Sequence, residues 1–149
     1  MLTQWRIRLL ANDTQACFRT LERSDVSLIR APQRPIVNGC GYRDGVAPAA
    51  SSLDLQSPPV MRCALAAAYA AWELQVVAPA ARRHLGSDLE SVRHLGVYSC
   101  RDIAGRAGRR SQHATANAID VSGFTLSDGR VVTLRRDWNN PGPAGRFLR

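Results

Sequence analysis

The chain has 149 residues, of which 45% are hydrophobic and 21% are charged, as expected for a soluble domain with one core. No apolar run approaches the ~18 residues that span a bilayer, so we expect no transmembrane segment. The formal net charge is +8, and all twenty basic residues are arginines scattered along the chain; this favours anionic partners, but no recognition motif accompanies it, and we expect no nucleic acid.

The N-terminal third is predicted to be mostly short elements. Residues 1–14 are interpreted as a leader or extension, without the apolar stretch and cleavage site of a signal peptide. Asp13 or Thr14 can cap a helix over 15–23, and 27–29 is typical of a strand. Residues 44–59, rich in Pro, Ala and Ser, predict a connecting loop with room for one short strand.

The strongest helix prediction covers residues 60–77. Ser57 is a good N-cap, and Pro58-Pro59 fit a first helical turn, where no amide partner is needed. Pro79 predicts a kink or an end, and Gly86 closes the helix. Bulky apolar residues at helical spacing predict the face that packs on the core: Leu65, Trp72 and Val76.

Strands dominate the predicted C-terminal half. Residues 91–100 alternate in part, 102–110 read as an exposed loop, and Ser127-Asp128-Gly129 predicts a hairpin turn. We therefore expect an α+β fold, in which the helix packs on a small, mainly antiparallel sheet. Its strands would include 97–100, 118–124 and 131–134.

Four cysteines are widely spaced, and no Cys-x-x-Cys pair suggests a zinc ribbon. An even number permits two disulfides in three connectivities, which would place the protein in an oxidising compartment such as the periplasm. Four buried free thiols are the alternative. The candidates are Cys17, Cys40, Cys63 and Cys100.

One segment combines two zinc donors. His113 and Asp120 bracket a turn of small residues that leads into a predicted strand, and such a turn can bring imidazole and carboxylate together. A catalytic zinc needs three protein ligands and one open position for water. For an isolated pair, the alternative is a loop histidine and a turn-capping aspartate.

The surrounding motif favours the metal. Ser111-Gln112-His113 through Ala118-Ile119-Asp120 resembles Ser-x-His-x-x-Gly-x-Ala-x-Asp, the zinc signature of D-alanyl-D-alanine peptidases and their hedgehog-like relatives. Ala116 replaces its glycine. The chain also resembles the bacterial extensin-like C-terminal domain over residues 15–149, on the following segments: Asn38-Gly39-Cys40-Gly41, Cys63-Ala64-Leu65-Ala66 with Trp72, Tyr98-Ser99-Cys100-Arg101, and Asn117 to Phe124 followed by Asp128-Gly129-Arg130.

The resemblance implies a D-Ala-D-Ala peptidase/hedgehog-like fold and assigns roles. His113 and Asp120 would be zinc ligands, Ser111 would brace the ligand loop, and Arg101 would hold a peptide carboxylate through a forked contact. The family continues into a His-x-His element that supplies the third ligand near the general base. This chain ends before that element, so we expect a C-terminally truncated domain whose general base is unknown. His84, His94, Glu73 and Glu90 match no motif for these roles.

The resemblance implies a zinc-dependent peptidoglycan peptidase domain of the periplasm or cell envelope, inactive unless the third ligand is supplied. A non-catalytic domain that binds the cell wall is the alternative. Expected partners are peptidoglycan peptides or an anionic cell-wall polymer. Because the helix should cover the strand that carries Arg101, we predict a Cys63–Cys100 disulfide, which leaves Cys17 with Cys40.

Overall fold

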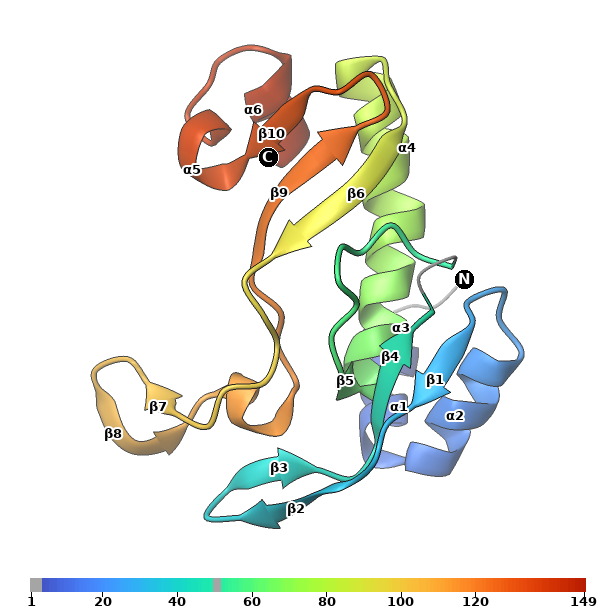
Figure 1. Ribbon diagram of the computed structural model, residues 1–149, viewed down its shortest axis with the longest axis vertical. Coiled ribbons are helices and arrows are strands. Elements are labelled where there is room, and N and C mark those ends of the chain that lie inside the picture. Colours follow the sequence, from blue (N-terminus) through green and yellow to red (C-terminus); the bar gives the residue numbers. More distant parts are fainter. Residues whose placement is uncertain (1–3, 50–51) are drawn as a thin grey trace.

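One long helix runs through the middle of the computed structural model, which describes residues 4–49 and 52–149 (Figure 1). It is continuous from Cys63 to Leu85 and consists of α3 (Cys63–Trp72), the π-helical turn η1 (Glu73–Val77), α4 (Ala78–Ala80) and the π-helical turn η2 (Ala81–Leu85). By length and composition alone this helix could cross a membrane, but 44% of its most apolar window is buried inside the protein.

Small antiparallel sheets flank this helix at its two ends. One sheet has the order β1-β4-β5 and the other β10-β9-β6, while β2–β3 and β7–β8 are two-stranded hairpins. The strands are β1 (Leu28–Arg30), β2 (Arg34–Val37), β3 (Cys40–Tyr42), β4 (Gly45–Pro48), β5 (Met61–Arg62), β6 (Leu89–His94), β7 (Asp102–Ile103), β8 (Arg106–Arg110), β9 (Val121–Leu126) and β10 (Val131–Thr133). The remaining helices are α1 (Gln4–Asn12), α2 (Thr14–Glu22), η3 (Gln112–Thr115), α5 (Leu134–Asp137) and α6 (Pro143–Leu148).

The predicted α+β class is therefore confirmed. Asp13 caps α2 by accepting a hydrogen bond from the Ala16 amide. The predicted hairpin is present as well, with β9 and β10 joined at Ser127–Arg130. The strand predicted over 91–100 is wrong at its C-terminal end, because β6 stops at His94 and Gly96 adopts φ 115°, a conformation that breaks regular pairing.

The predicted helix start is also wrong. The helix begins at Cys63, and Ser57 has φ 45° and does not cap it. The chain stays extended after the two prolines because Met61 and Arg62 pair with β4 as strand β5. Pairing with a neighbouring strand outweighs local helix propensity here.

The π-helical turn explains which residues of the helix face the core. Trp72 packs against Phe124 of β9 with ring centroids 6.2 Å apart, but Val76 is 53% exposed and Val77 is buried. A π turn closes with an i→i+5 hydrogen bond and so inserts one residue, which moves the inward position from 76 to 77. Val76 was therefore assigned to the wrong face.

Glu73 lies in this π turn and is buried, with 1% of its surface exposed. Its carboxylate accepts hydrogen bonds from the Tyr69 hydroxyl (2.6 Å) and the Asp54 amide (2.7 Å). Residues 54–56 in turn pair with Val92 of β6. Glu73 thus joins the helix to an edge segment of the second sheet.

Burial raises the pKa of Glu73, and therefore gives the unfolding free energy a pH dependence. A carboxyl with a raised pKa stabilises the fold fully below the unfolded value of about 4.5, and this stability is lost as pH rises through the folded pKa. We expect Glu73→Gln, measured by urea unfolding, to become more stable relative to wild type as pH rises above 4.5. Parallel profiles for the two proteins would contradict this expectation; Asp54→Asn is the companion variant, because burial raises the pKa of Asp54 too.

Candidate metal centre

The loop that carries His113 is a single 3-10 turn, η3. Ser111 caps it, with its hydroxyl accepting a hydrogen bond from the His113 amide (3.3 Å). Ala116 ends the turn in the left-handed region with φ 53°. Glycine adopts this conformation freely, whereas an alanine is strained by about 1 kcal/mol. The alanine that replaces the signature's glycine therefore sits where positive φ is required.

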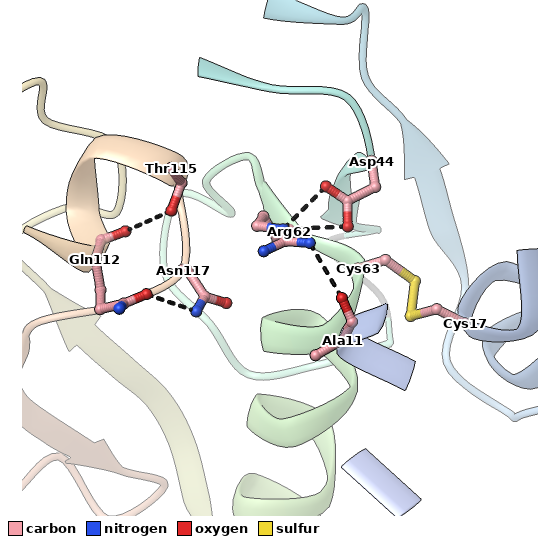
Figure 2. A network of polar contacts seen from close by, with 8 residues as sticks. All are labelled: Ala11, Cys17, Asp44, Arg62, Cys63, Gln112, Thr115 and Asn117. Atoms are coloured by element: carbon pink, nitrogen blue, oxygen red, sulfur yellow. Dashed lines mark hydrogen bonds and ion pairs between the residues drawn. A yellow bond between two sulfur atoms is a disulfide. The ribbon is translucent and has the colours of Figure 1, made fainter. Parts of the chain in front are cut away.

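Arg62, the last residue of β5 before the long helix, holds this loop in place. The Arg62 amide donates to the Ala116 carbonyl at 2.9 Å. Within the loop, Asn117 donates to the Gln112 side chain (2.8 Å) and Thr115 to the Gln112 carbonyl (3.3 Å) (Figure 2). The motif revealed none of these positioning contacts. The one feature of the sequence that could have predicted the Asn117–Gln112 contact is the spacing of these two residues, five positions apart across a turn of small residues.

Arg62 extends the same network toward the N-terminal helices. Its Nε lies 3.1 Å from the Asp44 carboxylate, and its Nη2 donates to the Ala11 carbonyl at 3.3 Å (Figure 2). The neighbouring residue, Cys63, forms a disulfide with Cys17 of α2. The base of the candidate site is therefore fixed to two other parts of the fold through Arg62 and Cys63.

The extended segment 95–101, which follows β6, orders both candidate ligands. Its Val97 carbonyl lies 2.7 Å from Nδ1 of His113, and its Ser99 amide donates to the His113 carbonyl at 3.0 Å. Asp120 pairs with the same segment one step earlier: the Leu95 amide donates to the Asp120 carbonyl at 2.8 Å. Two residues seven apart in sequence are thus positioned by adjacent stretches of one backbone.

His113 and Asp120 converge as the motif predicts for a metal pair. Nε2 of His113 lies 3.3 Å from Oδ2 of Asp120, with 10% and 56% of the respective side chains exposed. The imidazole is held inside the fold while the carboxylate faces solvent. The pair is therefore open to a ligand from one side.

The hydrogen bond to Val97 fixes which ring nitrogen of His113 carries a proton. A carbonyl oxygen only accepts, so Nδ1 must carry the proton shared with Val97. In the neutral ring Nε2 is then a bare lone pair that faces a carboxylate oxygen. Such a pair needs either a second proton or a cation between its members. The distance of 3.3 Å between Nε2 of His113 and Oδ2 of Asp120 is longer than the ~2.7–2.9 Å of a charge-assisted hydrogen bond.

The same distance fits zinc. Two donors at zinc–ligand distances of about 2.05 Å, seen at a tetrahedral angle, lie about 3.3 Å apart. The Nδ1–H···O=C bond to Val97 is also the outer contact that metal-bound histidines make, since it fixes the tautomer that leaves Nε2 free. The donor types, their separation and the tautomer therefore fit a zinc ion.

No third donor joins this pair in the part of the chain that the structure describes. Within residues 4–49 and 52–149, no group of three His, Cys, Asp or Glu side chains could hold a metal. His94 is engaged elsewhere: its Nε2 lies 2.8 Å from the Gln56 carbonyl, and its Nδ1 accepts from the Gly96 amide. His84 lies in η2 and Glu90 is exposed on β6.

Arg101 lies on the segment that also holds His113. Its carbonyl accepts a hydrogen bond from the Ser111 amide (3.0 Å), and its exposed guanidinium contacts the Asp102 carbonyl at 3.5 Å. This pairing continues the one between Ser99 and His113, so by register Arg101 and Ser111 share one face of the paired backbones. That arrangement is compatible with a carboxylate-binding role beside the pair.

All four cysteines are in disulfides, as one of the two sequence interpretations expected, but the predicted pairing is wrong. The bonds are Cys17–Cys63 and Cys40–Cys100, with Cα separations of 6.1 and 5.5 Å. The helix start contacts α2 rather than the segment before Arg101. That segment leaves the sheet after Gly96 and reaches the β2–β3 hairpin instead (Figure 1).

These features define an α+β domain, held by two disulfides, with a solvent-accessible histidine–aspartate pair on a small-residue loop. The family described as extensin-like protein C-terminus matches residues 15–149, and the chain belongs to it, which confirms the family predicted from the sequence. No curated protein and no solved structure matches the chain.

Proposed function

We propose that this domain is a zinc-dependent peptidase domain that acts on peptides of the bacterial cell wall. One observation carries the proposal. Nε2 of His113 lies 3.3 Å from Oδ2 of Asp120, the donor separation of a tetrahedral zinc site, and Nδ1 of the same ring is held by the Val97 carbonyl. The peptide substrate comes from the resemblance to D-alanyl-D-alanine peptidases in the same ten residues.

Each residue has a distinct role in this proposal. His113 and Asp120 hold the metal, and Ser111 orients the turn through its contact with the His113 amide. Arg101 binds a substrate carboxylate and so positions the neighbouring peptide bond. Bound zinc would supply Lewis acidity and an activated water. The resemblance assigns the third ligand to a His-x-His element that lies close to the general base, and this element is not among residues 1–149.

The two disulfides support a location in the periplasm or cell envelope. Disulfides persist in oxidising compartments and are rare in the cytosol, where thiols are kept reduced. Peptidoglycan lies in the same compartment. The disulfides and the proposed substrate therefore both support a location in the periplasm or cell envelope.

Zinc titration by calorimetry tests the metal site directly. We expect one zinc per chain, bound weakly because the described residues supply only two protein ligands. His113→Ala and Asp120→Asn should each weaken zinc binding at least about tenfold, because neither variant keeps both of the proposed zinc ligands. His84→Gln is the matched control, which removes a histidine from η2 and should change affinity less than about twofold. Zinc binding that survives His113→Ala would show that the ligands are wrong.

A non-catalytic cell-wall-binding domain is the second candidate. It is favoured by the absence of a three-donor group among the described residues. Digestion of muropeptides separates the two functions. The peptidase proposal expects hydrolysis once a His-x-His segment is supplied, and loss of that hydrolysis in His113→Ala. Zinc-loaded protein that binds muropeptides but leaves them intact would favour the second function.

A further inference from the structure

Two hairpins project from the same side of the domain and concentrate its charge (Figure 1). Residues 34–42 and 99–110, which contain β2–β3 and β7–β8, hold five arginines and one aspartate. Their formal net charge of +4 is half of the +8 carried by the whole chain. The five are Arg34, Arg101, Arg106, Arg109 and Arg110. We call these two segments the twin hairpins.

The twin hairpins are fixed to each other. The Cys40–Cys100 disulfide joins β3 to the segment that leads into β7. Arg110 crosses between them: its Nε donates to the Asn38 carbonyl (2.9 Å), and its Nη1 pairs with Asp102 (2.9 Å). A ligand that binds here therefore meets a largely ordered surface, which lowers the entropy lost on binding.

Most of this charge is not neutralised. The single carboxylate, Asp102, is already paired with Arg110. The side chains of Arg106 and Arg109 are exposed and make no hydrogen bond or ion pair with any residue of 4–49 or 52–149. The guanidinium carbon of Arg34 lies over the Tyr98 ring, 4.4 Å from its centre. At least three guanidinium groups, those of Arg34, Arg106 and Arg109, therefore lack an anionic partner within the described residues.

The twin hairpins continue directly into the candidate metal centre. Ser99 donates to the His113 carbonyl and the Arg101 carbonyl accepts from Ser111, so the hairpin base and the metal loop share one run of hydrogen bonds. A polymer held on the hairpins would pass beside His113 and Asp120.

We infer that the twin hairpins are a docking surface for a carboxylate-bearing polymer, which they anchor beside the metal centre. Guanidinium forks bind carboxylates in a bidentate manner, and several unpaired arginines on an ordered surface suit a chain with repeated carboxylates. The choice of carboxylate rests on the proposed function, because cell-wall peptides carry such groups.

The aromatic residues argue against a nucleic acid as the ligand. Single-stranded nucleic acids need open aromatic faces on which bases stack. Tyr98 is covered by Arg34 on one face, and Tyr42 meets it edge-on at 5.7 Å. Both tyrosines are only partly exposed, so neither offers a free stacking platform.

Binding of fluorescently labelled poly-D-glutamate, followed by anisotropy over a salt series, tests this inference. All samples contain EDTA, so the result does not depend on the zinc site. We expect Arg106→Gln/Arg109→Gln to bind about tenfold more weakly and to reduce the slope of log K against log salt by about 1–2. The matched control is Arg83→Gln/Arg135→Gln, which removes two exposed arginines outside the hairpins and should stay within about twofold of wild type.

Three outcomes would overturn the inference: no binding by wild type, an equal loss in the control pair, or tighter binding of single-stranded DNA than of poly-D-glutamate. Circular dichroism checks that both double variants are folded. Zinc titration of the same proteins keeps the two proposals apart. A variant that loses polymer binding but keeps its zinc affinity tests the hairpin proposal alone. A variant that loses zinc affinity but keeps polymer binding tests the metal-centre proposal alone.

Discussion

Replacing Cys17 and Cys63 together by alanine is expected to lower the free energy of unfolding by about 4 kcal/mol. The bond closes a loop of 46 residues, and its removal releases that constraint on the unfolded chain. Both residues are fully buried where α2 meets the start of the long helix, so packing is lost as well. Urea unfolding under non-reducing conditions measures the change.

The second disulfide provides the comparison. Cys40–Cys100 closes 60 residues, a span for which loop entropy alone gives a similar value. It lies outside the main core cluster, with Cys40 buried and Cys100 exposed. Without it, the hairpins stay connected through Arg110 and through the contacts of Arg34 and Tyr42 with Tyr98. We therefore expect Cys40→Ala/Cys100→Ala to be less destabilising than the first pair. Equal or reversed losses would show that the core contact at Cys17–Cys63 contributes little.

The next large effect is expected at Arg62. Asp44 has 7% of its side chain exposed and Arg62 28%, so Arg62→Met leaves a nearly buried carboxylate without its partner. Breaking such a pair should destabilise the protein by about 3 kcal/mol, measured by urea unfolding. Asp44→Asn in the same background should recover part of the loss, because it removes the unpaired charge.

Arg30 supplies the control for this experiment. It also pairs with a carboxylate, that of Glu22, but both side chains are about 60% exposed. Arg30→Met should therefore cost less than about 1 kcal/mol. If Arg30→Met and Arg62→Met lower the free energy of unfolding by similar amounts, the burial of Asp44 does not determine the cost of breaking its ion pair.

The sequence predicted the parts of the structure that depend on local chemistry. Asp13 as a helix cap and the turn at 127–129 are set by residues within a few positions of each other. The convergence of His113 with Asp120 followed from one continuous motif. These features need no knowledge of the rest of the fold.

Most of the failures involve partners distant in sequence. The helix start moved to Cys63 because β4 pairs with residues 61–62, and the disulfides followed the packing of α2 rather than of the strand before Arg101. The π turn that begins at Glu73 could not be predicted, because no pattern of apolar residues in the sequence indicates such a turn. Arg62 also had no signal, since its partners Asp44 and Ala11 lie 18 and 51 residues away.

The pairing of segment 95–101 has a consequence for how much change the loop between the two donors tolerates. His113 is attached at Val97 and Ser99, and Asp120 at Leu95 and Gly96, each by its own backbone contacts. The distance between the side chains of His113 and Asp120 is therefore set by their pairing with residues 95–97 and not by the six residues between them. An extra residue at 117–119 could bulge outward and leave the pair intact, whereas an insertion between Gly96 and Val97 would drive the donors apart by one strand step of about 3.3 Å.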